Sequence, residues 1–100
     1  MAGVPGVYYG AFTATADGDA LVGATHVDVL LSGTFVATVK VQIQDAQDNW
    51  VNVDSLTTPG FKTYLCGAPH NWRLQCSAFT SGSAAYELSG SRNEDYQVPY

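Results

Sequence analysis

The stretch Ser32–Asp54, SGTFVATVKVQIQDAQDNWVNVD, contains the pattern that decides the fold. From residue 34 to 44, apolar residues alternate with polar ones, which is the spacing of a strand with one side on a core and the other in water. The polar run 45–49 predicts a turn, and a second strand follows it and ends by Ser55. The stretch therefore predicts a β-hairpin. Its core determinants are expected to be Val39, Val41, Ile43 and Trp50, while Thr38, Lys40, Gln42 and Gln44 point away from the core.

The rest of the chain repeats this kind of pattern. Runs of β-branched, aromatic and alternating residues predict strands at 8–15, 25–31, 61–66, 69–79 and 84–88, with a short strand at 21–22 that Gly23 breaks. In the 69–79 run, Trp72 and Leu74 fall on the inward side as further core determinants. Turn signals recur about every 8–12 residues, and no window has a helical period. We therefore predict an all-β protein: a single antiparallel β-sandwich, jelly-roll or Ig-like, with seven to eight short strands.

The length of 100 residues leaves room for one domain only. We assign residues 1–88 to the β-sandwich domain, including an N-terminal arm, and residues 89–100 to an extended C-terminal arm. This last segment is polar, with Pro99 near its end. Two interpretations stay open for it: a frayed tail, or an arm that becomes ordered on a neighbouring subunit.

The charge pattern excludes several partners. The formal net charge is −5, and the four cations are scattered along the chain rather than clustered, so we expect no nucleic-acid binding. The N-terminal run lacks a basic region and is interrupted by Pro5, Gly6 and Gly10. Neither a secretory signal nor a membrane span is readable, and we expect no membrane partner.

The two cysteines are predicted to be reduced thiols. Cys66 and Cys76 fall on runs that look like successive strands of a hairpin, offset by about three positions at about 3.3 Å each, which is too far apart for a disulfide. His70 lies between them, but the spacing lacks the usual pairs and a fourth ligand for zinc. The chain is therefore expected to bind no metal.

Other catalytic patterns are also missing from the sequence. The paired carboxylates Asp17 with Asp19 and Asp45 with Asp48 sit in turn-like runs, where Asp bonds the backbone, and no nucleophile motif is present. We expect a protein that is not an enzyme and needs no cofactor.

The hairpin is similar to a recurrent pattern in small β-sandwich virion proteins of tailed bacteriophages. The similarity lies in Gly33-Thr34-Phe35, the alternating 38–44 run, and Trp50 and Val53 after the polar turn. The 69–78 run, with Arg73 and Leu74, resembles the following strand of that family. The usual turn has adjacent glycines, whereas this chain has Asp45-Ala46-Gln47-Asp48-Asn49.

The resemblance implies a structural subunit made in the host bacterial cytoplasm and located in the virion. It would be a capsid decoration (cement) protein or a tail, adaptor or fibre component. Its partners would be the major capsid protein or other virion proteins, and it would be present as a homo-oligomer or in many copies on a lattice. The chain ends are the expected contact regions, and the assembly-interface candidates are Val4, Val7, Tyr8, Tyr9, Tyr96, Val98 and Tyr100.

Aromatic residues support an alternative from another class. The chain has six tyrosines and two tryptophans, more rings than a core of this size needs. Surplus rings serve either as interface anchors or as platforms for sugars. A glycan-binding module is therefore the main competing hypothesis.

Overall fold

The computed structural model describes residues 6–91, and this part of the chain contains strands and no helix. The strands are β1 (Gly6–Phe12), β2 (Ala16–Asp17), β3 (Leu21–Ser32), β4 (Phe35–Gln44), β5 (Trp50–Leu56), β6 (Gly60–Gly82) and β7 (Ala84–Ser91). All of their pairings are antiparallel. The predicted all-β antiparallel sandwich is confirmed.

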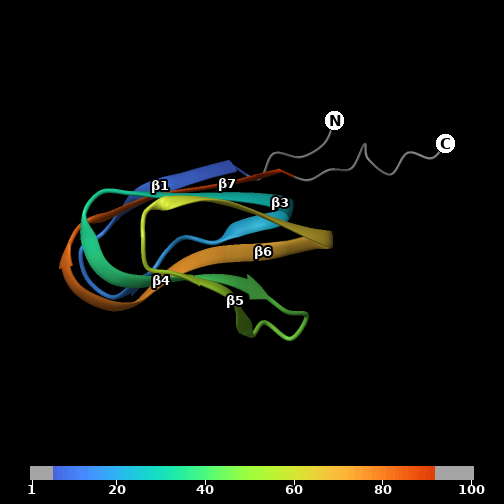
Figure 1. Ribbon diagram of the computed structural model, residues 1–100. Coiled ribbons are helices and arrows are strands. Elements are labelled where there is room, and N and C mark those ends of the chain that lie inside the picture. The colour runs from blue at the N-terminus through green and yellow to red at the C-terminus, as the bar shows by residue number, and fades with distance from the viewer. Residues whose placement is uncertain (1–5, 92–100) are drawn as a thin grey trace.

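Strand β6 joins the two layers of the sandwich. Its first half pairs with β3 and its second half with β4, and Trp72 is the partner of both Leu21 and Ile43. The hydrogen-bonded order is β1-β7-β3-β6-β4-β5, with β2 beside β6. In Figure 1, β6 runs along the upper layer, bends at the right-hand end and returns in the lower layer. One continuous sheet is thereby folded over on itself.

This continuity corrects two expectations. Residues 61–66 and 69–79 were expected to be separate strands that pair as a hairpin, but they are halves of one strand in different layers. The runs 21–22 and 25–31 likewise belong to one strand, β3, which passes Gly23 with a φ of 71°. The β3–β6 ladder has register shifts between Leu21 and His26. Such irregularities let both strands bend together, so no loop has to interrupt the pairing.

The core lies between the layers and consists of side chains at alternate strand positions. Val39, Val41, Trp72 and Leu74, four of the six expected core determinants, are buried, and Ile43 packs against this cluster. The other fully or nearly buried apolar residues are Phe12, Leu21, Ala24, Val27, Val29, Leu31, Cys76, Ala84 and Leu88. Phe12 stacks on Tyr86 with ring centroids 4.7 Å apart. The inward side of every long strand thus contributes to a single core.

Trp50, the sixth expected core determinant, lies elsewhere. It pairs with Gln44, which is on the outward side of β4. Because residues directly opposite in a ladder share a face of the sheet, the register places Trp50 on the outside of the sandwich. There the guanidinium of Arg73 covers its ring, with Cζ 4.4 Å from the ring centroid. The expectation that Trp50 specifies the core is wrong.

The turn between β4 and β5 is held by its first carboxylate. Asp45 Oδ1 accepts hydrogen bonds from the backbone N–H groups of Gln47 (2.8 Å) and Asn49 (2.9 Å), and Asp48 has a φ of 68°. These bonds hold the pKa of Asp45 below its ordinary value, because they favour the charged form. Asp45 and Asp48 are therefore turn residues, as the sequence predicts.

Two corners that carry the chain between the layers lie against each other, at the opposite end from the β6 bend. Gly33 and Thr34 connect β3 to β4, while Ser83 connects Gly82, the last residue of β6, to β7. The N–H of Ser83 donates to the Thr34 carbonyl at 3.0 Å. Gly82 has a φ of 90°, and a Cβ there would collide with the Thr34 carbonyl oxygen. The close approach of the two corners therefore requires glycine.

Strand β7 ends at Ser91, three residues inside the segment that the sequence assigned to the C-terminal arm. Ser89 and Gly90 pair with Val7 and Gly6 of β1, and Ser91 pairs with His26 of β3. Residues 89–91 thus belong to the sheet. The remainder of the expected arm, 92–100, lies outside the described residues.

Candidate docking surface

The outer face of the upper layer carries a row of exposed side chains across four strands, and three of the four are apolar. The cross-strand pairings Tyr9↔Glu87, Glu87↔Leu30 and Leu30↔Phe61 place these residues side by side on β1, β7, β3 and β6. Relative exposures are 80% for Tyr9, 41% for Leu30 and 61% for Phe61. We call the outward side of these strands the apolar face. Its rings and aliphatic groups are in water rather than in the core.

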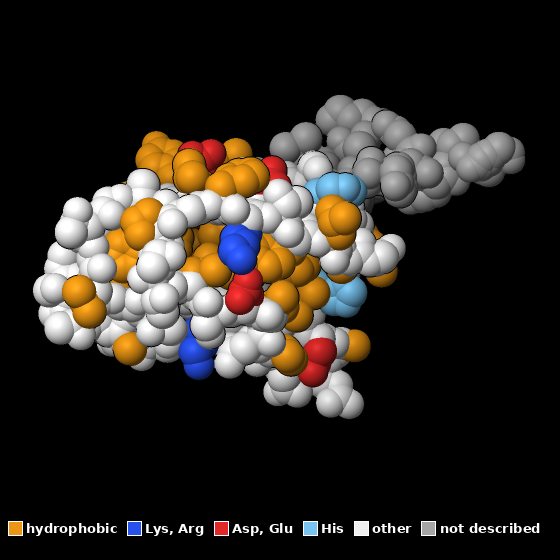
Figure 2. Space-filling model, in the orientation of Figure 1, with side chains coloured by type: hydrophobic (Ala, Val, Ile, Leu, Met, Phe, Trp, Pro, Cys, Tyr) orange, Lys and Arg blue, Asp and Glu red, His pale blue; other side chains and the backbone are white. Residues whose placement is uncertain are grey.

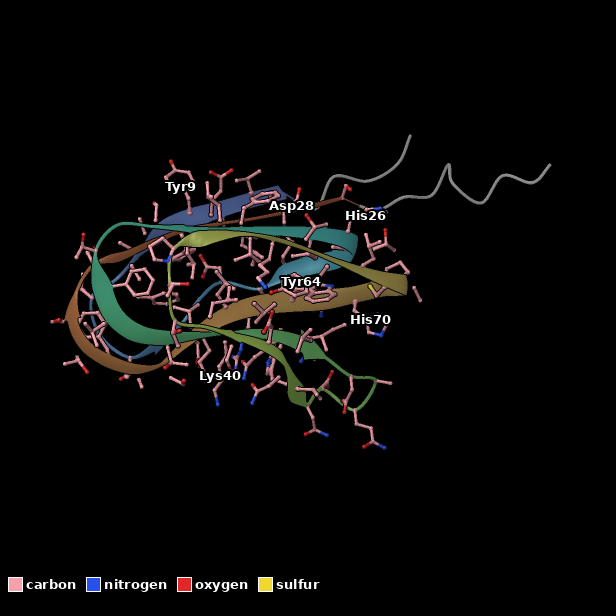
Figure 3. All side chains as sticks on the ribbon, viewed as in Figure 1. Tyr9, His26, Asp28, Lys40, Tyr64 and His70 are labelled. Carbon is pink, nitrogen blue, oxygen red and sulfur yellow. The ribbon has the colours of Figure 1, made fainter. Side chains whose placement is uncertain are left out.

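Neighbouring rows extend this surface. The next row contains Val7, Ser89, Asp28 and Thr63, and the one after it contains Ser91, His26 and Leu65. Val7 and Leu65 are again exposed apolar side chains. Figure 3 shows Tyr9, Asp28 and His26 on the same outer side, and Lys40 on the opposite side of the molecule. Figure 2 shows hydrophobic side chains along this upper edge with acidic ones between them.

Two carboxylates lie within the apolar face. Glu87 is exposed between Tyr9 and Leu30, and within residues 6–91 it has no hydrogen-bond or ion-pair partner. Asp28 is diagonal to Glu87 and accepts a hydrogen bond from the Thr63 hydroxyl at 2.8 Å. The cations of the described segment lie elsewhere: Lys40 on β4, Arg73 on the second half of β6, and Lys62 at an inward position opposite Val29. This face is therefore apolar and acidic.

The structure brings together some of the predicted interface candidates. Val7 and Tyr9 point outward on β1, while Tyr8, between them, is partly buried and packs against the core. Val4, Tyr96, Val98 and Tyr100 lie outside the described residues. The sequence reasoning missed Leu30 and Phe61. The available signal was Leu30 itself, an apolar residue in phase with His26 and Asp28 on the polar side of its strand.

The outer face of the lower layer is different in composition. We call it the polar face: the outward side chains of β2, β4, β5 and the second half of β6. Gln42 is at its centre and only 6% exposed. Its Nε2 donates to Asn52 Oδ1 (2.8 Å) and Gln75 Oε1 (3.2 Å), and its Oε1 accepts from Arg73 Nε (2.7 Å). Arg73 also forms an ion pair with Asp17 at 3.4 Å. These groups satisfy one another.

The groups that sequence reasoning considered for chemistry are occupied in structural roles. Both thiols are free, and burial raises the pKa of Cys66 and of Cys76. A raised pKa keeps a thiol protonated and therefore a poor nucleophile or metal ligand. Cys66 Sγ donates to the Ala68 carbonyl at 3.0 Å, and the same carbonyl contacts His70 Nδ1 at 2.7 Å. Within residues 6–91, no group of three His, Cys, Asp or Glu side chains is arranged to hold a metal ion.

The fold and the two faces define an all-β sandwich with a candidate docking surface. No family model and no curated protein sequence matches the chain. The crystal structure of the SPBc2 prophage-derived protein YomS is similar, with a TM-score of 0.61 and 10% identity over 83% of this chain and 93% of that one. The Yersinia pseudotuberculosis-derived mitogen has a TM-score of 0.52 and 13% identity over 95% of this chain and 90% of that one. At these identities the likeness establishes a shared fold.

Helices long and apolar enough to cross a membrane are not found among the described residues.

Proposed function

We propose that this chain is a non-enzymatic structural protein of a phage particle, attached to the outside of the capsid as a decoration (cement) protein. The observation that carries the proposal is the apolar row of Tyr9, Leu30 and Phe61. Leu30 and Phe61 are direct neighbours, and Tyr9 lies on the other side of Glu87. Exposed apolar side chains that gather on one surface mark sites of contact with other proteins. The resemblance of the hairpin to small virion proteins supports the phage assignment, as does the fold shared with a prophage-derived protein.

The proposed mechanism is mechanical. Fully burying one large apolar side chain is worth about 1.5–3 kcal/mol, so a capsid surface that covers this row gains binding free energy. If the surface exists only in the assembled shell, binding stabilises assembly by mass action. When a copy binds at each equivalent position of the lattice, these contributions add up and increase the stability of the assembled shell. The partners would be the major capsid protein or other virion proteins at the particle surface.

Particle binding tests the proposal directly. Particles of the source phage that lack this gene would be mixed with the purified full chain, sedimented, and assayed for bound protein. The double variant Tyr9→Ser with Phe61→Ser should lose about 100-fold in affinity, since a few aromatic anchors carry most of the binding energy of an interface. Lys40→Ser, on the polar face, is the matched control and should bind like the wild type.

Two results would contradict the proposal. One is a wild-type chain that does not bind the particles, and the other is a double variant that binds as well as the control. Electron microscopy of labelled particles would separate the capsid role from the tail, adaptor or fibre alternatives, because label on the tail alone places the protein there.

A carbohydrate-binding function is the second candidate, and the exposed Tyr9 ring favours it. Two observations weigh against it. The ring face of Trp50 is covered by Arg73, and the exposed ring of Phe61 lies directly opposite the aliphatic Leu30. Exposed rings that cluster with aliphatic side chains are typical of a surface that contacts another protein. Saturable binding of the isolated chain on a glycan array, lost in Tyr9→Ser, would replace the docking proposal.

A further inference from the structure

The charge of the apolar face identifies the kind of partner that covers it; this inference rests on the docking function proposed above. Glu87 lies between Tyr9 and Leu30, and Asp28 is its diagonal neighbour across β7 and β3. Diagonal residues on an antiparallel pair are about 7–8 Å apart, close enough for one cationic group to contact both carboxylates. Among residues 6–91, this face holds His26 but no Lys or Arg. Glu87 and Asp28 therefore have no Lys or Arg partner from this part of the chain.

A second copy docking through the same face does not supply that group. Such an interface is isologous, so each protomer would bring its own Glu87 and Asp28 into the apolar contact. The four carboxylates of the two copies would then lose their contact with water, and no Lys or Arg from residues 6–91 would lie beside them. Burying unpaired charges is costly, and like charges placed opposite one another suppress association. Charge complementarity instead favours a different, basic partner.

We propose that the apolar face binds a protein segment that brings an Arg or Lys side chain to Glu87 and Asp28, flanked by apolar side chains that cover Leu30 and Phe61. Tyr9 is directly opposite Glu87 in the ladder, so a cation on the carboxylate also lies beside the ring. A guanidinium is suited to both contacts, because it pairs with carboxylates through parallel hydrogen bonds and stacks on aromatic faces. Arg is therefore the preferred cation.

Selection from a random 12-residue peptide display library tests this partner chemistry. The immobilised full chain is the target, and the chain with Glu87→Gln and Asp28→Asn is the parallel target. Gln and Asn keep the size of the side chains, and the amide oxygen introduced by Asp28→Asn can still accept the hydrogen bond from Thr63. Enriched peptides should contain Arg or Lys next to apolar residues. The enriched peptides would then be synthesised and titrated by fluorescence anisotropy.

The expected result is a loss of about tenfold or more in affinity for the Glu87→Gln and Asp28→Asn variant, since a charge-assisted hydrogen bond is lost. Added salt should weaken binding to the wild type and have little effect on binding to this variant, because screening acts on the charge contact. Lys40→Ser, on the opposite face, should leave both affinity and salt dependence unchanged.

Different failures are distinguishable. If enriched peptides lack basic residues, or bind both targets equally while still requiring Tyr9 and Phe61, the cation site is wrong and the docking surface stands. If no peptide is enriched over the Tyr9→Ser and Phe61→Ser chain, both the basic partner and this surface fail. Sedimentation of the chain alone is the last check. A dimer that the Tyr9→Ser and Phe61→Ser changes dissolve would show that a second copy is the occupant and would overturn the proposal.

Discussion

The two outer faces of this sandwich use their side chains in opposite ways. On the polar face, Gln42, Arg73 and their neighbours bond to one another, and Arg73 covers the ring of Trp50. On the apolar face, Tyr9 and Phe61 are exposed, and Glu87 has no partner within residues 6–91. Both faces belong to the same folded-over sheet and share one core. The difference indicates that the polar face contributes to the stability of the folded chain, whereas the apolar face is the one that we propose for binding.

A matched pair of substitutions, one on each face, tests most directly whether the two faces differ in their contribution to stability. Gln42→Leu removes three side-chain hydrogen bonds from a nearly buried position and leaves Arg73 Nε without its acceptor. Unsatisfied buried polar groups cost about 1–3 kcal/mol each, so we expect the free energy of unfolding to fall by about 2 kcal/mol. Phe61→Thr keeps a strand-forming residue on the apolar face and should change it by less than about 0.5 kcal/mol. Urea titration monitored by tryptophan fluorescence measures both.

Lys40→Leu is the control for the first substitution, because Lys40 lies on the same strand and face as Gln42. Within residues 6–91 its side chain forms no hydrogen bond or ion pair. If Gln42→Leu is as stable as this control, the amide network does not hold the polar face together. If instead Phe61→Thr is the more destabilising change, the apolar row is a structural element and not a free surface.

A smaller effect is expected from the contact between Arg73 and Trp50. A double-mutant cycle of Arg73→Met and Trp50→Leu isolates the interaction of the guanidinium with the ring, whose geometry is a centroid distance of 4.4 Å. Cation–π pairs at partly exposed sites are worth about 0.5–1 kcal/mol, and the coupling energy should fall in that range. A coupling energy of zero would mean that Trp50 is merely covered by Arg73 and gains nothing from its charge.

The sequence allowed the sandwich and most of its core to be predicted, because burial follows a strict two-residue period in a strand. Val39 and Val41 are in phase with the core along β4, and Val27 and Val29 are in phase along β3. Periodicity says nothing about which strand lies opposite, however. The continuity of β6 depends on pairing with β3 around the bend, which is a long-range property. For that reason, residues 61–66 and 69–79 were expected to be two strands of a hairpin, whereas they are two halves of β6.

The outward-facing residues, including those of the candidate docking surface, were less predictable for a related reason. Trp50 is outward because the turn fixes it opposite Gln44, and composition alone favours a tryptophan in the core. The apolar row exists only because β1, β7, β3 and β6 are aligned, so that Tyr9, Leu30 and Phe61 lie in one line across the sheet. Each of them alone is an ordinary exposed apolar residue. Their alignment is visible only in the register.

The smallest predicted effect concerns a contact on neither face, which ties the two layers together. Tyr64, in the first half of β6, donates from its hydroxyl to Asp54 Oδ2 of β5 at 2.7 Å. This bond is the main reason that the pKa of Asp54 is below its ordinary value. A carboxyl group with a lowered pKa in the folded state contributes stability that is complete above its ordinary pKa of about 4 and is lost as the pH falls through the lowered value.

Tyr64→Phe should therefore reduce the part of the stability that is lost in acid. The urea midpoint of the variant should fall less than that of the wild type between pH 7 and pH 3, even if the variant is less stable at pH 7. Asp45→Asn is the control, because it removes a separate lowered pKa in the β4–β5 turn and its effect should add to that of Tyr64→Phe. An identical pH dependence in the wild type and Tyr64→Phe would show that the bond between Tyr64 and Asp54 contributes nothing to the stability that is lost in acid.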